Sequence, residues 1–145
     1  PDQTPGSPLV DISLATADGN YVILDLGNGV YAFYAHLVPG SVAVQVGDTV
    51  TKGQIIGKLG NSGSSDGAHL HFHLMDAPSA LVANSVPYVF DSYELTGQLP
   101  PLSELGPYYE GQLPMPIDTT VASAQVDTLP LGGNVMDFSE AGSSS

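Results

Sequence analysis

Short apolar runs separated by glycine and proline fill most of the chain, and the periodicity of amphipathic helices is almost absent. Two runs rich in β-branched and aromatic residues, 21–26 (YVILDL) and 30–37 (VYAFYAHL), flank the short connection 27–29. Because that connection reads Gly-Asn-Gly, it favours a β-hairpin. The pattern predicts an all-β fold with an antiparallel sheet at its core.

The middle of the chain continues in the same style. Valines alternate with other residues over 42–46, and glycine-containing turns at 47–48 and 52–53 predict a compact meander. A polar glycine- and serine-rich loop, 61–67 (NSGSSDG), then leads into another period-2 strand, 69–75 (HLHFHLM). We expect this loop to help form a functional site.

The last third of the chain has a different character. Residues 86–95 predict one more strand, with its aromatic side chains packed partly inward. After it, prolines and acidic residues replace the alternating pattern, and Lys and Arg are absent. We therefore expect a β-sheet core domain over 1–97 and an acidic, Pro-rich, irregular and partly disordered arm over 98–145, loose at its end. Apolar clusters at 113–117 and 135–138 are the parts of the arm expected to dock on the sheet.

Composition limits the possible functions. The 145 residues hold 2 Lys and Arg against 15 Asp and Glu, a net charge of −13, with 42% hydrophobic residues. Such an acidic chain can bury a core, but it cannot neutralise the phosphates of nucleic acid or bind an anionic membrane surface. No apolar stretch is long enough to insert into a membrane, and no signal peptide is evident. Because cysteine is absent, a metal site has to use histidine and carboxylate ligands.

The histidines are the candidate functional residues. Strand alternation places His69, His71 and His73 on one face of the strand 69–75, with its apolar residues on the other. Neutral imidazoles spaced in this way can bind a metal, although the same pattern fits a solvated polar face on an edge strand. The fourth histidine, His36, follows an apolar run where a strand leaves the sheet. Taken alone, it reads as an ordinary strand-end histidine.

Several motifs occur together in a consistent order and spacing between residues 19 and 75. They are Tyr-Ala-His-Leu at 34–37, VGDTV at 46–50, KGQIIG at 52–57, GNSG at 60–63 and GAHLHF at 67–72. With them the chain resembles the lysostaphin-type zinc metallopeptidases, which are peptidoglycan endopeptidases with a β-sheet core known as the duplicated hybrid motif. A branch of that family with long insertions is similar as far as residue 97. The resemblance implies a zinc-activated water that attacks peptide bonds of the bacterial cell wall, and an extracytoplasmic location.

Residue by residue, the resemblance implies roles for the histidines. His71 matches the zinc ligand that is the second histidine of the family's His-x-His motif. His36 and His69 match the two catalytic histidines that orient the water and stabilise the oxyanion. His73 stands where many relatives carry Glu. It is a candidate for orienting a metal ligand through a hydrogen bond, or for binding a metal adventitiously.

Two further zinc ligands of the family, a histidine and an aspartate in an HxxxD pattern, have no counterpart here, because no histidine precedes His36. Either the matching segment lies upstream of Pro1, and this chain lacks the first part of the domain, or the site is degenerate. We expect zinc in the first case and no metal in the second, since catalytic zinc takes three protein ligands.

Three functions follow from these observations. The first is a zinc endopeptidase acting on peptidoglycan or a related peptide. The second is a catalytically degenerate relative that binds cell-wall peptide or a partner protein without hydrolysis. The third, a biotin- or lipoyl-type carrier suggested by the turns around Lys52, leaves the four patterned histidines unexplained and is rejected.

Overall fold

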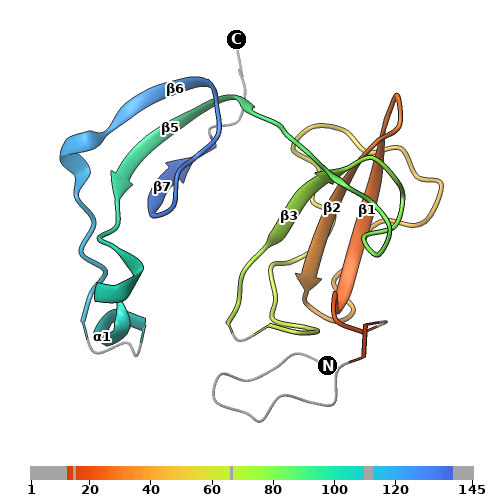
Figure 1. Cartoon of the computed structure of the whole chain (residues 1–145), viewed down its shortest axis with the longest axis horizontal. Helices are drawn as coiled ribbons and strands as arrows, with labels where there is room; N and C mark the ends of the chain where they lie inside the picture. The colour runs from red at the N-terminus through yellow and green to blue at the C-terminus, as the bar shows by residue number, and fades with distance from the viewer. Residues whose placement is uncertain (1–12, 15, 66, 110–112, 139–145) are drawn as a thin grey trace. The chain divides into compact units, whose positions relative to one another are not determined.

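The computed structural model describes residues 13–14, 16–65, 67–109 and 113–138. It forms two compact units, Pro1–Pro87 and Tyr88–Ser145. Each unit contains one antiparallel sheet, and the described helical segments are single turns (Figure 1). The predicted all-β fold class is confirmed. No helix among the described residues is long and apolar enough to cross a membrane.

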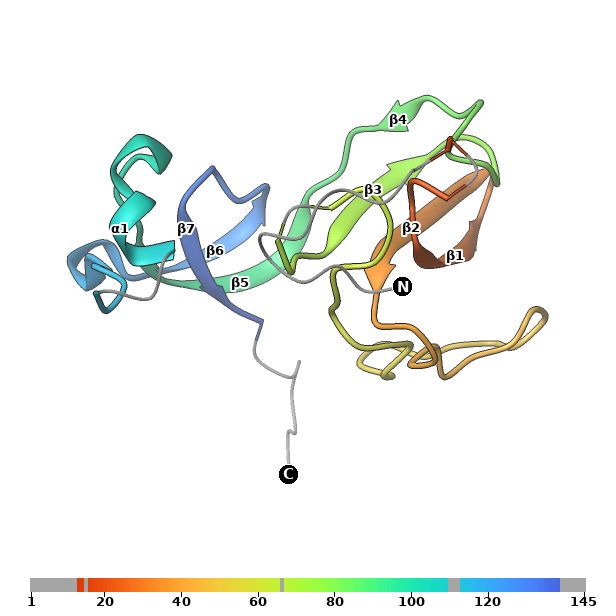
Figure 2. The same cartoon turned by 90° about the horizontal axis from the view of Figure 1, so that it is seen from below.

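The sheet of the first unit has the strand order β1-β2-β3-β4. Its strands are β1 (Asn20–Gly27), β2 (Val30–Leu37), β3 (His71–Met75) and β4 (Ser85–Val86). The predicted hairpin joins β1 to β2, and its turn needs the left-handed backbone of Gly27, Asn28 and Gly29, with φ of 84°, 54° and 76°. Figure 2 shows the short β4 beside β3, with which it pairs.

The predicted meander at 42–56 does not form strands. Between β2 and β3 the described residues hold only isolated bridges, Leu37 with Leu59 and Gly60 with His69. The turns at the predicted glycines are present, but alternate valines such as Val46 remain exposed. Alternation yields a stable strand only when one of its faces is buried, and Val42 and Val46 are exposed. β3 begins at His71, two residues later than predicted, and His69 forms an isolated bridge with Gly60.

The core of the first unit lies on the face of the sheet that also carries the histidines. Phe33, Ala35 and Met75 are its buried members. They pack against partly buried hydrophobic residues from β1, β2 and the segment before β4, namely Ile23, Tyr31, Ala80 and Ala83. The register pairs Phe33 with His73 and Ala35 with His71. The histidines of β3 therefore stand on the same face as the core residues of β2.

The second unit has the strand order β6-β5-β7. It contains β5 (Phe90–Gln98), a 3-10 turn at Leu102–Glu104, α1 (Gly106–Tyr109), a 3-10 turn at Thr119–Val121, β6 (Ser123–Thr128) and β7 (Asn134–Asp137). The expected domain boundary after residue 97 falls within β5, and the units divide earlier because β5 pairs with both β6 and β7. Much of the expected arm is irregular, while the cluster at 135–138 contributes to β7. Its final residues, 139–145, lie outside the described part.

Aromatic packing holds the second sheet together. Tyr93 is buried, and the ring centroids of Phe90 and Phe138 lie 4.9 Å apart. The ring of Tyr93 lies 5.7 Å from that of Phe138. The prediction that the aromatic residues of this strand pack partly inward is confirmed for Tyr93.

We expect Met75→Ala to lower the free energy of unfolding of the first unit by about 2–5 kcal/mol, because the side chain is fully buried and its loss leaves a cavity. Leu81→Ala is the control, because its side chain is 67% exposed and its removal should cost less than about 0.5 kcal/mol. Urea unfolding followed by circular dichroism measures both. Equal losses in the two variants would contradict the proposed core.

Candidate active site

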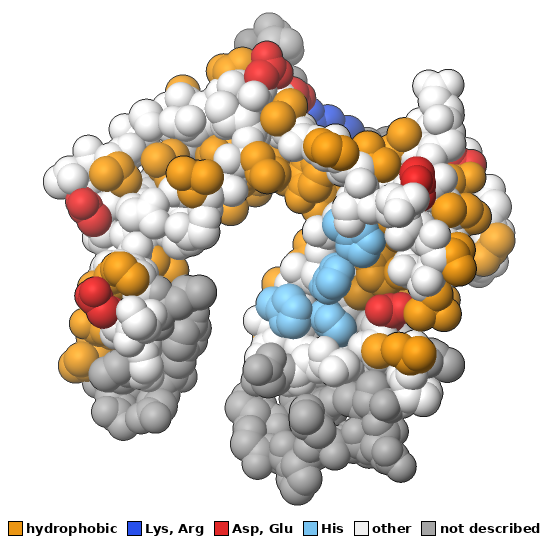
Figure 3. All heavy atoms as spheres, in the orientation of Figure 1, with side chains coloured by type: hydrophobic (Ala, Val, Ile, Leu, Met, Phe, Trp, Pro, Cys, Tyr) orange, Lys and Arg blue, Asp and Glu red, His pale blue; other side chains and the backbone are white. Residues whose placement is uncertain are grey.

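The four histidines form one continuous row on the first unit, visible as the pale blue side chains in Figure 3. His71 and His73 belong to β3, His36 stands near the end of β2, and His69 precedes β3. The ring centroids of His69 and His36 lie 4.8 Å apart, those of His36 and His71 5.7 Å, and those of His71 and His73 5.1 Å. All four sequence-predicted residues are thus brought together.

Strand alternation explains the positions of His71 and His73. Both rings pack against the ring of Phe33, with centroid distances of 5.7 and 5.2 Å. The two imidazoles also contact each other, with His71 Nε2 3.0 Å from His73 Nδ1. The two side chains therefore lie on the same face of the sheet, as predicted.

His36 reaches the row because its backbone breaks the alternation. Since Ala35 pairs with His71, regular alternation would place His36 on the opposite face, beside Tyr34 and Phe72. The φ of His36 is instead +61°, a left-handed conformation that is rare for a residue with a side chain. Its ring thereby lies against His69 and His71. Such strained residues are concentrated at functional sites, at a cost of about 1–3 kcal/mol each.

The loop that follows the predicted meander holds His36 in this conformation. The Nδ1 of His36 lies 2.7 Å from the carbonyl oxygen of Ser62, and its backbone N–H donates to the Asp18 carbonyl at 3.1 Å. The buried hydroxyl of Ser62 donates to the Leu37 carbonyl at 2.6 Å and accepts from the Asn20 N–H at 3.0 Å. One serine therefore connects the start of β1 to the end of β2.

Two glycines permit this close approach. A Cβ at Gly19 would overlap Ser62, and a Cβ at Gly63 would overlap the Ala17 carbonyl oxygen and Gly19. Both glycines also have positive φ. The expectation that the 61–67 loop helps to form the site thus has a physical basis, but the partners of Ser62 are distant in sequence and no local pattern identifies them.

His69, at one end of the row, is held by the same loop. Its Nδ1 lies 2.8 Å from the carbonyl oxygen of Gly67 and 3.2 Å from Ser65 Oγ. The Ser65 hydroxyl also contacts Asn61 Oδ1. Ser65 and Asn61 are both buried, whereas His69 itself is exposed.

The electrostatic surroundings favour a neutral His71. Desolvation is the main cause that lowers its pKa below the ordinary imidazole value of 6.5, and the imidazoles of His73 and His36 lower it further. The carboxylate of Asp18 opposes this effect in part. A neutral imidazole is the form that binds metal ions.

The described residues do not complete a zinc site. Within them, no group of three His, Asp or Glu side chains is arranged to hold a metal ion. Four carboxylates precede His36. Asp25 accepts from the Gly27 N–H in the hairpin, Asp18 interacts electrostatically with His71, and Asp2 and Asp11 lie outside the described residues. His71 remains the one candidate ligand that family resemblance assigns.

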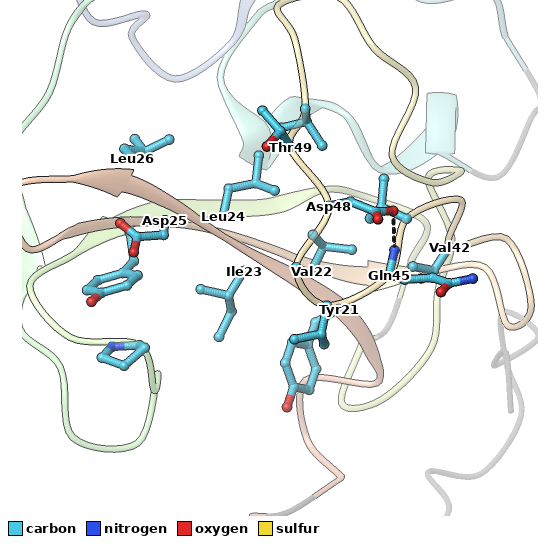
Figure 4. Close-up of a pocket in the computed structure, with 16 residues that line it drawn as sticks. Tyr21, Val22, Ile23, Leu24, Asp25, Leu26, Val42, Gln45, Asp48 and Thr49 are labelled. Atoms are coloured by element: carbon cyan, nitrogen blue, oxygen red, sulfur yellow. Dashed lines mark hydrogen bonds between the residues drawn. The ribbon is translucent and has the colours of Figure 1, made fainter.

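A cleft of about 700 Å³ runs along β1 (Figure 4). It is lined by Tyr21–Leu26, by Tyr31 and Pro78, and by residues of the 42–50 segment, which a hydrogen bond from the Gln45 N–H to Asp48 helps to shape. None of its lining residues is a histidine. Tyr21 links the cleft indirectly to the histidine row. The Tyr21 ring lies 5.7 Å from that of Phe33, which contacts His71 and His73.

We expect Gly19→Ala to destabilise the first unit by roughly 1–3 kcal/mol more than Gly53→Ala, the matched control. Both glycines have positive φ, so each substitution carries the same backbone strain. Only at Gly19 does the added methyl also overlap Ser62, because nothing lies within 4 Å of a Cβ at Gly53. Urea unfolding of both variants measures the difference, and equal stabilities would show that the contact between the two segments is loose.

Comparison with known proteins places this geometry in context. The sequence profile of peptidase family M23 matches residues 9–83, which contain all four histidines. Over 57 residues the chain is 42% identical to the peptidoglycan DD-endopeptidase ShyA of Vibrio cholerae serotype O1. That match covers 39% of this chain and 13% of ShyA, so the chain spans a small part of this relative. No solved structure matches the chain significantly.

Proposed function

Because the chain belongs to peptidase family M23, we propose that its first unit is part of a zinc endopeptidase that hydrolyses peptide bonds in bacterial peptidoglycan. The observation that carries the proposal is the contact of His36 with both His69 and His71, made through a left-handed backbone. The similarity to ShyA, a peptidoglycan DD-endopeptidase, supports the substrate class. The protein would then act outside the cytoplasm, where peptidoglycan lies.

We assign proton transfer and oxyanion stabilisation to His36 and His69. Their rings are adjacent, and an imidazole aimed at a developing negative charge lowers the barrier to attack on an amide. We assign to His71 the role of a zinc ligand, because it matches the zinc ligand of the family's His-x-His motif and its lowered pKa favours the neutral form. When bound, zinc lowers the pKa of its water toward neutrality. Its remaining protein ligands are not supplied by the described residues.

A degenerate relative is the second candidate, and the incomplete ligand set among the described residues favours it. Such a protein would keep the histidine row and bind cell-wall peptide without hydrolysis. The two candidates differ in zinc content and in turnover, and binding to peptidoglycan is common to both.

Hydrolysis of purified cross-linked muropeptides in the presence of zinc, by the full-length protein that contains this chain, tests the proposal. We expect His36→Ala and His69→Ala each to lower kcat/KM by about 100- to 10,000-fold, the usual contribution of a general acid or base. His71→Ala should lose bound zinc as well as activity. Thr51→Ala, at an exposed residue of another segment, should match the unaltered chain.

The outcomes separate the candidates. Unchanged turnover in all three histidine variants would refute the assigned roles. A full-length protein containing this chain that binds peptidoglycan but neither holds zinc nor hydrolyses muropeptides would favour the degenerate relative. Failure of both binding and hydrolysis in that protein would exclude the peptidase and a relative that binds cell-wall peptide, and would leave a relative that binds a partner protein.

A further inference from the structure

Ser65 lies at the centre of a small polar network beside the histidine row. Its hydroxyl contacts Asn61 Oδ1, lies 2.9 Å from the Gly67 carbonyl oxygen and lies 3.2 Å from His69 Nδ1. Ser65 itself is 4% exposed, and its contact with Asn61 is buried. No buried polar side-chain atom of the described residues lacks a partner. The orientation of each hydrogen in this network is therefore constrained by its neighbours.

The donors and acceptors around His69 decide which ring nitrogen carries the proton. A carbonyl oxygen only accepts hydrogen bonds, so the Gly67 carbonyl, 2.8 Å from His69 Nδ1, requires Nδ1 to be the donor. The single proton of the Ser65 hydroxyl is directed to Asn61 Oδ1 and the Gly67 carbonyl. Its lone pairs are then left to accept from Nδ1. Both neighbours of Nδ1 thus favour the same tautomer.

His36 reaches the same tautomer by a different route. Its Nδ1 lies 2.7 Å from the carbonyl oxygen of Ser62, which again can only accept. In their neutral forms both histidines therefore carry the proton on Nδ1 and keep the lone pair on Nε2. The difference is that a backbone group alone fixes His36, whereas a side chain, Ser65, supports His69.

From this we infer that Ser65 is a positioning residue that holds His69 in the Nδ1–H tautomer, with Nε2 as the nitrogen that exchanges protons with a bound peptide. Ser65 acts in two ways: it accepts from Nδ1, and it fixes the Gly67 carbonyl that accepts from the same nitrogen. The catalytic meaning of this inference rests on the proposed function. The tautomer itself is a property of the folded chain and does not depend on turnover.

The experiment is ¹⁵N NMR of the imidazole rings in the full chain at about pH 8, above the ordinary histidine pKa of about 6.5. In the unaltered chain we expect His36 and His69 each to show a protonated Nδ1 and an unprotonated Nε2. In Ser65→Ala we expect the His69 signals to shift to the averaged values of a mixed tautomer population, while those of His36 stay unchanged. Ser64→Ala, at the exposed neighbouring serine, should leave both histidines unchanged.

Two variants separate the hydroxyl from packing. Ser65→Thr keeps the hydroxyl and should keep the His69 tautomer, so loss of the tautomer in this variant as well would overturn the inference. A His69 that is protonated on Nε2 in the unaltered chain, or that is unchanged in a folded Ser65→Ala, would also overturn it. The unaltered chain alone decides the first of these points, even if Ser65→Ala fails to fold. Because no outcome depends on hydrolysis, this result and that of the muropeptide assay are independent.

Discussion

Ser62 contacts His36, the residue that follows it and the start of β1, and the arrangement of the site depends on these contacts. Its carbonyl faces His36 Nδ1, while its hydroxyl bridges Leu37 and Asn20. Left-handed backbone at a residue with a side chain costs about 1–3 kcal/mol. Three hydrogen bonds of about 0.5–1.5 kcal/mol each are sufficient to offset that cost. Without them, regular alternation would return His36 to the other face of the sheet.

The sheet supplies the rest of the geometry at little cost. Phe33 is buried in the core and at the same time supports the rings of His71 and His73. The residue that stabilises the fold therefore also positions the histidines of β3. Desolvation and the neighbouring imidazoles lower the pKa of His71, which favours its neutral form.

Features that depend on residues close together in the sequence could be predicted from it. The hairpin follows from its Gly-Asn-Gly connection, and the common face of His71 and His73 follows from period-2 alternation. The position of His36 could not be predicted, because its backbone conformation depends on Ser62, which lies 26 residues away in the sequence. The strands expected at 42–56 failed for a similar reason, since alternation shows which face is apolar but not whether another layer covers it. The second sheet was missed in part because β7 pairs with β5 across a long, proline-rich connection.

The central claim is that His36 turns onto the face of β3 that carries His71. Nuclear Overhauser effects between ring protons of histidine and those of neighbouring rings, in a chain protonated only at its aromatic residues, test it directly. Ring centroids 4.8 and 5.7 Å apart predict cross-peaks from His36 to His69 and to His71. Cross-peaks from His36 to Tyr34 and Phe72 instead, with none to the other histidines, would show that the strand alternates regularly and would contradict the account.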